Sequence, residues 1–312
     1  MNGIQLETFI AVLLGAGVVA SIPMLLAALG ETFAEQAGLL NLGIEGMMLM
    51  GAFGGFYVAL NSNSITAGLV SGLAIGAVLG LFFGFLTISL RVDQVLVGLG
   101  ITILGAGLTG FLFRDLYGRQ FPTLKTSLTK IAIPLLSDIP LIGPSLFNQQ
   151  SVVYVALLLV PLFSFVLNRT RLGLQMRAVG ENPFAADAAG VNVYWVRYVA
   201  IIIGGAMAGL GGAFLSVGDL NFFVPQMTLG QGFIAIALAM LGRWQPPRVL
   251  VGALLFGLLR SLANGLQIIG VQVQPEFILV LPYLGIIAAM ILLAGRTSLP
   301  AALGVPYERG SR

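Results

Sequence analysis

Residues 31–52 read ETFAEQAGLLNLGIEGMMLMGA, an apolar stretch that carries three carboxylates and repeated glycines. Glu31 and Glu35 open it, and Glu45 lies at the edge of the apolar run that follows. The residues that interrupt a continuous helix here are Asn41, Gly43, Glu45, Gly46 and Gly51. A broken helix at membrane depth is tolerated only where protein buries it or where it lines a watery cavity. The stretch therefore predicts a broken or re-entrant helix near residues 31–50.

The composition of the whole chain identifies the solvent in which this stretch folds. Only 9% of the 312 residues are charged and the mean hydropathy is +1.00, whereas soluble domains carry about 25% charged residues. Long windows hold no charge at all, for example residues 8–30 and 46–90. A helix of roughly 20 apolar residues spans the hydrocarbon core of a bilayer. We predict an all-α, polytopic transmembrane helical bundle with about 8–10 spans in a single transmembrane domain, residues 1–312.

The apolar windows place the expected helices near residues 9–29, 46–60, 65–90, 94–113, 151–167, 198–217, 228–241, 249–269 and 277–295. The segment 228–241 is short for a span and is expected to be a broken or re-entrant piece. The N-terminus has no basic region before its first apolar run and carries Glu7, which indicates a retained helix rather than a signal peptide. Glycines spaced four apart, such as Gly76, Gly80 and Gly84, predict close helix packing.

Basic residues are enriched in the cytoplasmic loops of membrane proteins. If the loop 168–197 is cytoplasmic, ten arginines lie inside: Arg91, Arg169, Arg171, Arg177, Arg197, Arg243, Arg248, Arg296, Arg309 and Arg312. Four basic residues then lie outside, in an extracytoplasmic loop over residues 114–150: Arg114, Arg119, Lys125 and Lys130. This orientation places the N-terminus outside. The net charge of +3 reports this topology and does not indicate nucleic-acid binding.

Several function classes are excluded by residues that the sequence lacks. Cysteine and histidine are absent, which removes Cys/His metal sites and histidine general bases. A P-loop needs a lysine directly after a glycine, but Leu124 and Thr129 precede the two lysines. No catalytic residues, no metal site and no bound cofactor are expected, so the chain is not expected to be an enzyme. Acids that could form an ion site are few, and something outside the chain is expected to supply the energy for transport.

The cytoplasmic loop contains a short segment, ENPFAADAAG (181–190), with the signals of a capped helix at both ends. Asn182 is a preferred N-cap residue, Pro183 fits the first helical position, and Gly190 fits the left-handed position that ends a helix. Phe184 is available as a projecting side chain. A helix of two turns is unstable alone in water, so it is expected to lodge against the bundle or against another protein.

At this point the sequence resembles a known family. RAVGENPFAADAAGVNV (177–193) and AIIIGGAMAGLGGAFL (200–215) are similar to the coupling-helix region of ABC importer permeases of the ribose and branched-chain amino acid type. GLLNLGIEGMMLMGA (38–52) and the ending from Pro282 to Gly310 resemble the nucleoside and simple-sugar subgroup of that family. The resemblance covers nearly the whole chain.

The resemblance implies a heteromeric importer in the lipid bilayer of a bacterial cytoplasmic (inner) membrane, in which this chain is a multi-pass subunit. Its other parts are a second homologous permease subunit, ATP-binding subunits that hold ATP and magnesium, and an extracytoplasmic substrate-binding lipoprotein. It implies coupling to the ATP-binding subunit through Gly180, Glu181, Asn182, Pro183, Phe184 and Gly190, with Arg177 and Asp187 as polar partners at the rim. The expected cargo is nucleosides, with simple sugars as the alternative. A stand-alone secondary carrier or channel is the competing class.

Two sets of polar residues are candidates for the translocation pathway. Asn41 and Glu45 lie at the predicted break, where Glu45 either shapes the pathway or caps the helix that begins at Gly46. Arg260, Asn264 and Gln267 fall at i, i+4 and i+7 on one helix face. They either line the pathway or include a structural arginine. A guanidinium inside a span needs a partner, and Glu45 and Asp219 are the candidates for Arg260.

Overall fold

The protein is an all-α bundle in the computed structural model, which describes residues 3–137, 139, 142–268, 280, 284–285, 287–288, 291 and 299–310. The long helices are α1 (Gly3–Gln36), α2 (Ile44–Ser62), α3 (Ile65–Gly84), α4 (Gln94–Tyr117), α6 (Ser151–Arg169), α9 (Val193–Ala213) and α11 (Pro246–Ile268). The shorter helices are α5 (Ile142–Leu146), α7 (Arg171–Glu181), α8 (Pro183–Ala188) and α10 (Gln231–Leu241). Wider π-helical turns, η1 (Phe85–Ser89) and η2 (Phe214–Asp219), extend α3 and α9.

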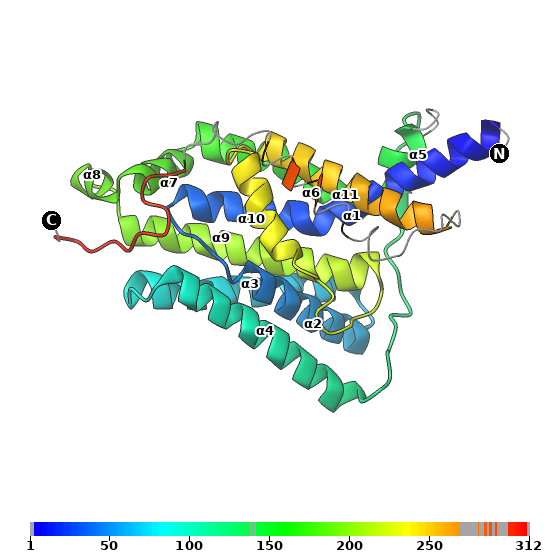
Figure 1. Ribbon diagram of the computed structural model, residues 1–312, viewed down its shortest axis with the longest axis horizontal. Helices are drawn as coiled ribbons and strands as arrows, with labels where there is room; N and C mark the ends of the chain where they lie inside the picture. Colours follow the sequence, from blue (N-terminus) through cyan, green and yellow to red (C-terminus); the bar gives the residue numbers. More distant parts are fainter. Residues whose placement is uncertain are drawn as a thin grey trace.

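Six helices among the described residues are long and apolar enough to cross a membrane: Phe9–Gln36, Ile65–Ser89, Gln94–Tyr117, Ser151–Arg169, Val193–Asp219 and Pro246–Ala263. These six confirm a multi-pass helical membrane protein. The α2 and α10 helices lie inside the same bundle (Figure 1). With 11 residues, α10 is about 16 Å long and does not reach across a bilayer. Most of the helix predicted over 277–295, and Arg296, lie outside the described residues, so the figure of 8–10 spans stays a prediction.

The predicted break near residues 31–50 is present but narrower. We expected the first helix to end near residue 29, whereas α1 continues to Gln36 and only residues 37–43 are non-helical before α2 begins. The helix continues because Glu31 and Glu35 are fully buried and have hydrogen-bond partners inside the protein. Of the residues that we expected to interrupt a helix, Asn41 and Gly43 lie in the break, whereas Glu45, Gly46 and Gly51 lie within α2.

The two ends of the bundle differ (Figure 1). The helices α7 and α8 and the C-terminal segment gather at one end, and the N-terminus and α5 lie at the other. The connection between α4 and α6 is at the second end and forms a small antiparallel pair, β1 (Lys130–Ala132) with β2 (Asn148–Gln150). The α4 helix extends to Tyr117, so the connection begins later than the predicted residue 114.

Glycine faces bring the central helices into backbone contact, as the spacing predicts. A Cβ added to Gly209 on α9 would lie 2.8 Å from the Cα of Gly76 on α3, and one added to Gly205 would lie 2.8 Å from the Cα of Gly80. Close approach without side chains is a common means by which membrane helices pack. The α9 helix is held in this way between α3, α1 and α2.

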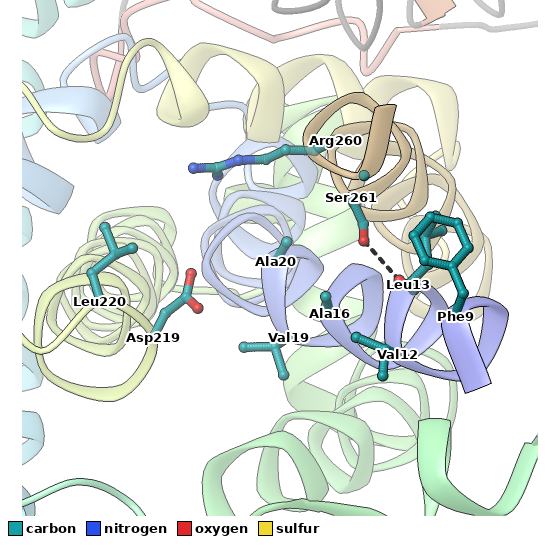
Figure 2. Close-up of a pocket in the computed structure, with 11 residues that line it drawn as sticks. Phe9, Val12, Leu13, Ala16, Val19, Ala20, Asp219, Leu220, Arg260 and Ser261 are labelled. Atoms are coloured by element: carbon teal, nitrogen blue, oxygen red, sulfur yellow. Dashed lines mark hydrogen bonds between the residues drawn. The ribbon is translucent and has the colours of Figure 1, made fainter. Parts of the chain in front are cut away.

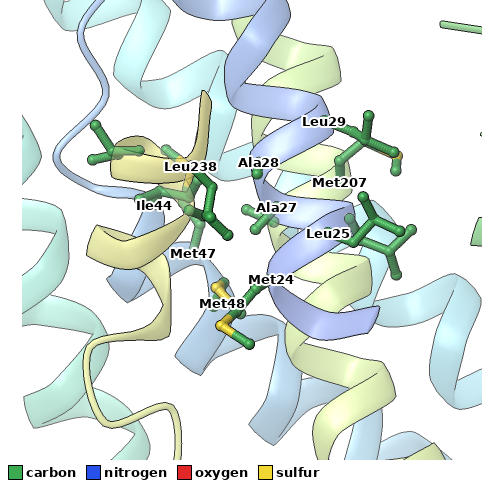
Figure 3. Packing of buried hydrophobic residues seen from close by; sticks show 14 of the residues in the cluster. Met24, Leu25, Ala27, Ala28, Leu29, Ile44, Met47, Met48, Met207 and Leu238 are labelled. Atoms are coloured by element: carbon green, nitrogen blue, oxygen red, sulfur yellow. The ribbon is translucent and has the colours of Figure 1, made fainter. Parts of the chain in front are cut away.

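Methionine and aliphatic side chains fill the remaining space between α1, α2, α9 and α10 (Figure 3). Met24 of α1, Met47 and Met48 of α2 and Leu238 of α10 lie together in one buried cluster, and Leu25 of α1 belongs to the same cluster on the side of Met207 of α9. This cluster fixes the start of α2 and the body of α10 against α1. The site described below is built on those two helix starts.

Candidate functional site

The short helix α8 forms with the caps that the sequence predicts. The Asn182 side chain accepts a hydrogen bond from the Ala185 amide at 3.0 Å, and Pro183 occupies the first helical position. Gly190 ends the helix at φ +85°, where an L side chain would be strained. The capped helix packs on α7 and α9. It is therefore a rigid projection at one end of the bundle.

The residues predicted for coupling divide into a buried face and an exposed face. Gly180 is buried because α7 crosses the end of α1 there, and any side chain would collide with the Gln36 carbonyl. Pro183 is also buried. Arg177, Glu181 and Asn182 are exposed, Phe184 is 48% exposed, and Asp187 is partly buried beside Arg309. An apolar side chain that projects from a rigid helix is suited to insertion into a groove on a partner protein.

Polar side chains satisfy the backbone of the 37–43 break. The Leu40 amide donates to Gln94 Oε1 at 2.8 Å, and the Asn41 amide donates to Glu31 Oε1 at 3.2 Å. Asn41 Oδ1 accepts from the Gly43 amide at 3.1 Å. Asn41 is fully buried, so its side chain organises the break itself.

Glu45 joins the starts of two helices. It lies in the first turn of α2, and its Oε1 accepts from the Thr228 hydroxyl at 2.5 Å and from the Gly230 amide at 2.9 Å. Its Oε2 accepts from the Gly232 amide at 2.7 Å. Helix N-termini carry unpaired amides and a partial positive charge, both of which a carboxylate satisfies. The Glu45 carboxylate thus holds the start of the short helix α10 against the start of α2.

A cavity of about 360 Å³ lies between α1, η2 and α11 (Figure 2). Its walls are mostly apolar side chains of α1, and its charged groups are Asp219 at the end of η2 and Arg260 on α11. Both charged side chains are half-buried and face the cavity from opposite sides. Within the described part of the chain no ion pair within 4.0 Å joins them. Of the two predicted partners of Arg260, Asp219 is the one that shares its cavity.

The two other members of the predicted polar face, Asn264 and Gln267, lie on α11 with Arg260. Their side chains are outside the described residues. Ser261, next to Arg260, is described, and its hydroxyl donates to the Leu13 carbonyl at 2.7 Å. This bond fixes α11 to α1 at the cavity wall (Figure 2).

Two groups of buried charge were missed by sequence reasoning. Glu35 accepts a hydrogen bond from the Trp244 indole in the turn between α10 and α11, which ties that turn to α1. Arg197, near the start of α9, is 2% exposed and donates to the Val305 carbonyl at 3.1 Å. The i, i+4 spacing of Glu31 and Glu35 was the available signal, because it marks one helix face. No sequence signal identifies Trp244 or Val305 as partners.

These contacts hold and position helices. Among the described residues no group of three or more metal-ligating acids is found. The bundle has a rigid projection, α8, at one end and a cavity with two opposite charges toward the other end. Glu45 joins the start of α2 to the start of α10.

Comparison with known proteins matches the sequence to one family over most of its length. Residues 13–293 match the family described as "Branched-chain amino acid transport system / permease component".

Among curated relatives, a "Putative glucose ABC transporter permease protein" of Haloferax volcanii is 44% identical over 86% of this chain and 82% of its own length. A "Guanosine ABC transporter permease protein" of Bacillus subtilis is 35% identical over 97% of this chain and 98% of its own. A "Nucleoside ABC transporter permease protein" of Lactococcus lactis is 35% identical over 92% of this chain and 93% of its own.

Removing the Glu45 carboxylate tests its role at the two helix starts. The Glu45→Ala variant leaves the Thr228 hydroxyl and the Gly230 and Gly232 amides without their partner. An unsatisfied buried polar group costs about 1–3 kcal/mol. We expect a clear fall in the thermal unfolding midpoint of the detergent-purified chain. Glu181→Ala, at an exposed position on α7, is the control and should leave the midpoint unchanged. Equal midpoints for the two variants would contradict the assignment.

Proposed function

Because the chain belongs to the family of branched-chain amino acid transport system permease components, we propose that it is the membrane-spanning permease subunit of an ATP-driven importer of nucleosides. The observation that carries the coupling part of this proposal is α8. It is a capped helix with Phe184 exposed, at the end of the bundle where α6 ends at Arg169 and α7 begins at Arg171. The excess of arginines supports a cytoplasmic location for that end.

The energy source in this proposal is a separate ATP-binding subunit that holds ATP and magnesium. The sequence supports this division because neither lysine follows a glycine as a P-loop requires. Closure of the ATP-binding subunit displaces α8, with Phe184 as the inserted side chain. Gly180, Asn182, Pro183 and Gly190 give the helix its shape and seat, and Arg177, Glu181 and Asp187 provide polar contacts at its rim.

The remaining partners in the proposal are a second permease subunit of the same family and an extracytoplasmic substrate-binding lipoprotein. The half-buried charges of Asp219 and Arg260 support the second permease, since a charged cavity within membrane-spanning helices must be shielded from lipid. The end opposite α8, which holds the β1–β2 pair, is the expected place for the lipoprotein to deliver its cargo.

Nucleosides are the proposed cargo because the two relatives named for guanosine and for nucleosides align with this chain over 97% and 92% of its length. Simple sugars are the second candidate, supported by the 44% identity to the putative glucose permease. Either cargo presents hydroxyl groups, which donate hydrogen bonds to a carboxylate and accept them from a guanidinium.

We place the pathway at the cavity between α1, η2 and α11, with Arg260 and Asp219 as its polar groups and Asn264 and Gln267 as further members of the same helix face. Asn41 and Glu45 act on transport only indirectly, because their side chains form hydrogen bonds within the protein. Their role in transport is to hold the broken helices in place.

The pathway assignment predicts that Arg260→Ala lowers guanosine uptake by the assembled importer without reducing ATP-binding subunit recovery. The reason is that the cavity loses its only described hydrogen-bonding cation. Losing a hydrogen bond to a charged group is worth about 1.5–3 kcal/mol, so uptake should fall by roughly tenfold or more. Arg248→Ala is the matched control, because Arg248 lies on the same helix but is exposed near its first residue. Normal uptake by Arg260→Ala would remove its pathway role.

The function itself is tested by replacing residues 182–190 with a flexible glycine–serine linker of equal length. The rigid projection is lost, so ATP-driven guanosine uptake should be abolished although the chain still inserts into the membrane. Phe184→Ala should weaken recovery of the ATP-binding subunit in co-purification, since it removes the exposed apolar side chain. The control is Ala188→Ser, an exposed position on the same short helix. Undiminished ATP-driven uptake by the linker variant would refute the proposed coupling.

A further inference from the structure

The C-terminal segment, residues 299–310, is bound across the end of the bundle that carries α7 and α8 (Figure 1). Three hydrogen bonds to its main chain attach it to three different parts of the protein. They are Ala302 N to the Gly180 carbonyl at 2.9 Å, Gly304 N to the Gly38 carbonyl at 3.1 Å, and Arg197 Nη1 to the Val305 carbonyl at 3.1 Å. One short stretch of chain thus contacts the end of α7, the 37–43 break and the start of α9.

Tyr307 is the buried anchor of this segment. It is 4% exposed, and its ring lies 5.2 Å from that of Phe184 on α8 and 5.6 Å from that of Tyr194 on α9, measured between centroids. Burial, and after it the hydrogen bond and charge of Asp187, raise the pKa of the Tyr307 phenol. The inner side of the exposed Phe184 rests on this ring.

Ion pairs complete the attachment but contribute little. Arg309 pairs with Asp187 of α8 at 3.1 Å, and Glu308 pairs with Arg91 in the turn between η1 and α4 at 2.6 Å. Both pairs are solvent-exposed on at least one side, and exposed pairs are worth about 0–1 kcal/mol each. The aromatic stack at Tyr307 and the main-chain hydrogen bonds are therefore the main attachments.

The segment gives α8 a second connection to the membrane-embedded break. The first runs through α7, where Gly180 packs on the last residue of α1. The second runs from Phe184 to Tyr307 and along the segment to the Gly38 carbonyl. Gly38 is fitted closely there: its φ is +82°, and an added Cβ would lie 2.9 Å from the Ala302 carbonyl oxygen and 3.2 Å from Arg197 Nη2. Because these contacts leave little free space, a displacement of α8 is transmitted to residues 38–41.

We infer that Tyr307 is a positioning residue for energy coupling: it holds α8 against the C-terminal segment so that movement of α8 is delivered to the 37–43 break. This inference rests on the proposed function, in which a partner displaces α8. From the break the movement reaches Glu31 through Asn41, and the start of α2 directly. The C-terminal segment is then part of the coupling device together with α7 and α8.

The experiment uses the complete importer in proteoliposomes and measures guanosine taken up per ATP hydrolysed. Tyr307→Leu keeps an apolar side chain at the buried position but removes the ring between Phe184 and Tyr194. Tyr307→Phe keeps the ring. The interaction free energy of an aromatic pair of this kind corresponds to roughly a two- to tenfold change in rate. We expect Tyr307→Leu to lower the uptake-to-ATP ratio by that factor while the ATP-binding subunit still co-purifies and hydrolyses ATP. Tyr307→Phe should restore most of the ratio.

The matched control is Val305→Ala, because the Val305 side chain is 50% exposed and only its carbonyl makes the contact to Arg197. An unchanged ratio in Tyr307→Leu would overturn the inference, as would loss of the ATP-binding subunit from that variant, which would assign Tyr307 to docking alone. Failure of the proposed function gives a different result, since the wild-type importer would then show no ATP-dependent uptake at all.

Discussion

The fold depends on satisfying main-chain groups where helices are broken inside a membrane. Lipid offers no hydrogen-bond partners, so each such group must find one within the protein. Four side chains meet this need in the described structure: Glu31, Asn41 and Gln94 at the 37–43 break, and Glu45 at the start of α10. The acids in the opening stretch are thus the partners that allow two helices to begin within the bundle.

This arrangement explains why charged residues are retained in so apolar a chain. Glu45 accepts hydrogen bonds from the backbone amides at the start of α10. Glu35 holds the turn that follows α10 through its hydrogen bond from Trp244. The short helix is therefore fixed at both ends to α1 and α2 by carboxylates. If α2 or α1 moves, α10 has to move with it or lose these bonds. A force applied near Gly38, at the end of the bundle that carries α7 and α8, consequently reaches the helices that surround the core shown in Figure 3.

Local signals allowed part of this to be predicted from sequence. Asn182, Pro183 and Gly190 act on neighbours within a few residues, and the predicted α8 has the predicted caps. The break near Asn41 was also predicted, although its length was not. The bonds that give the break its structure connect distant positions: Glu45 and Gly232 are 187 residues apart, and Arg197 and Val305 are 108 apart. No local pattern encodes such pairs, so the role of the C-terminal segment emerged only from the structure.

The central claim is that this chain has no energy source of its own and is moved from its cytoplasmic end by a partner. Reconstitution of the purified chain tests this most directly, once alone and once with its ATP-binding, second permease and substrate-binding partners. Guanosine uptake is measured with ATP on the side of α8 and, separately, with an imposed proton or sodium gradient. The account predicts uptake only in the complete assembly with ATP. Gradient-driven uptake by the chain alone would contradict it and identify a secondary carrier.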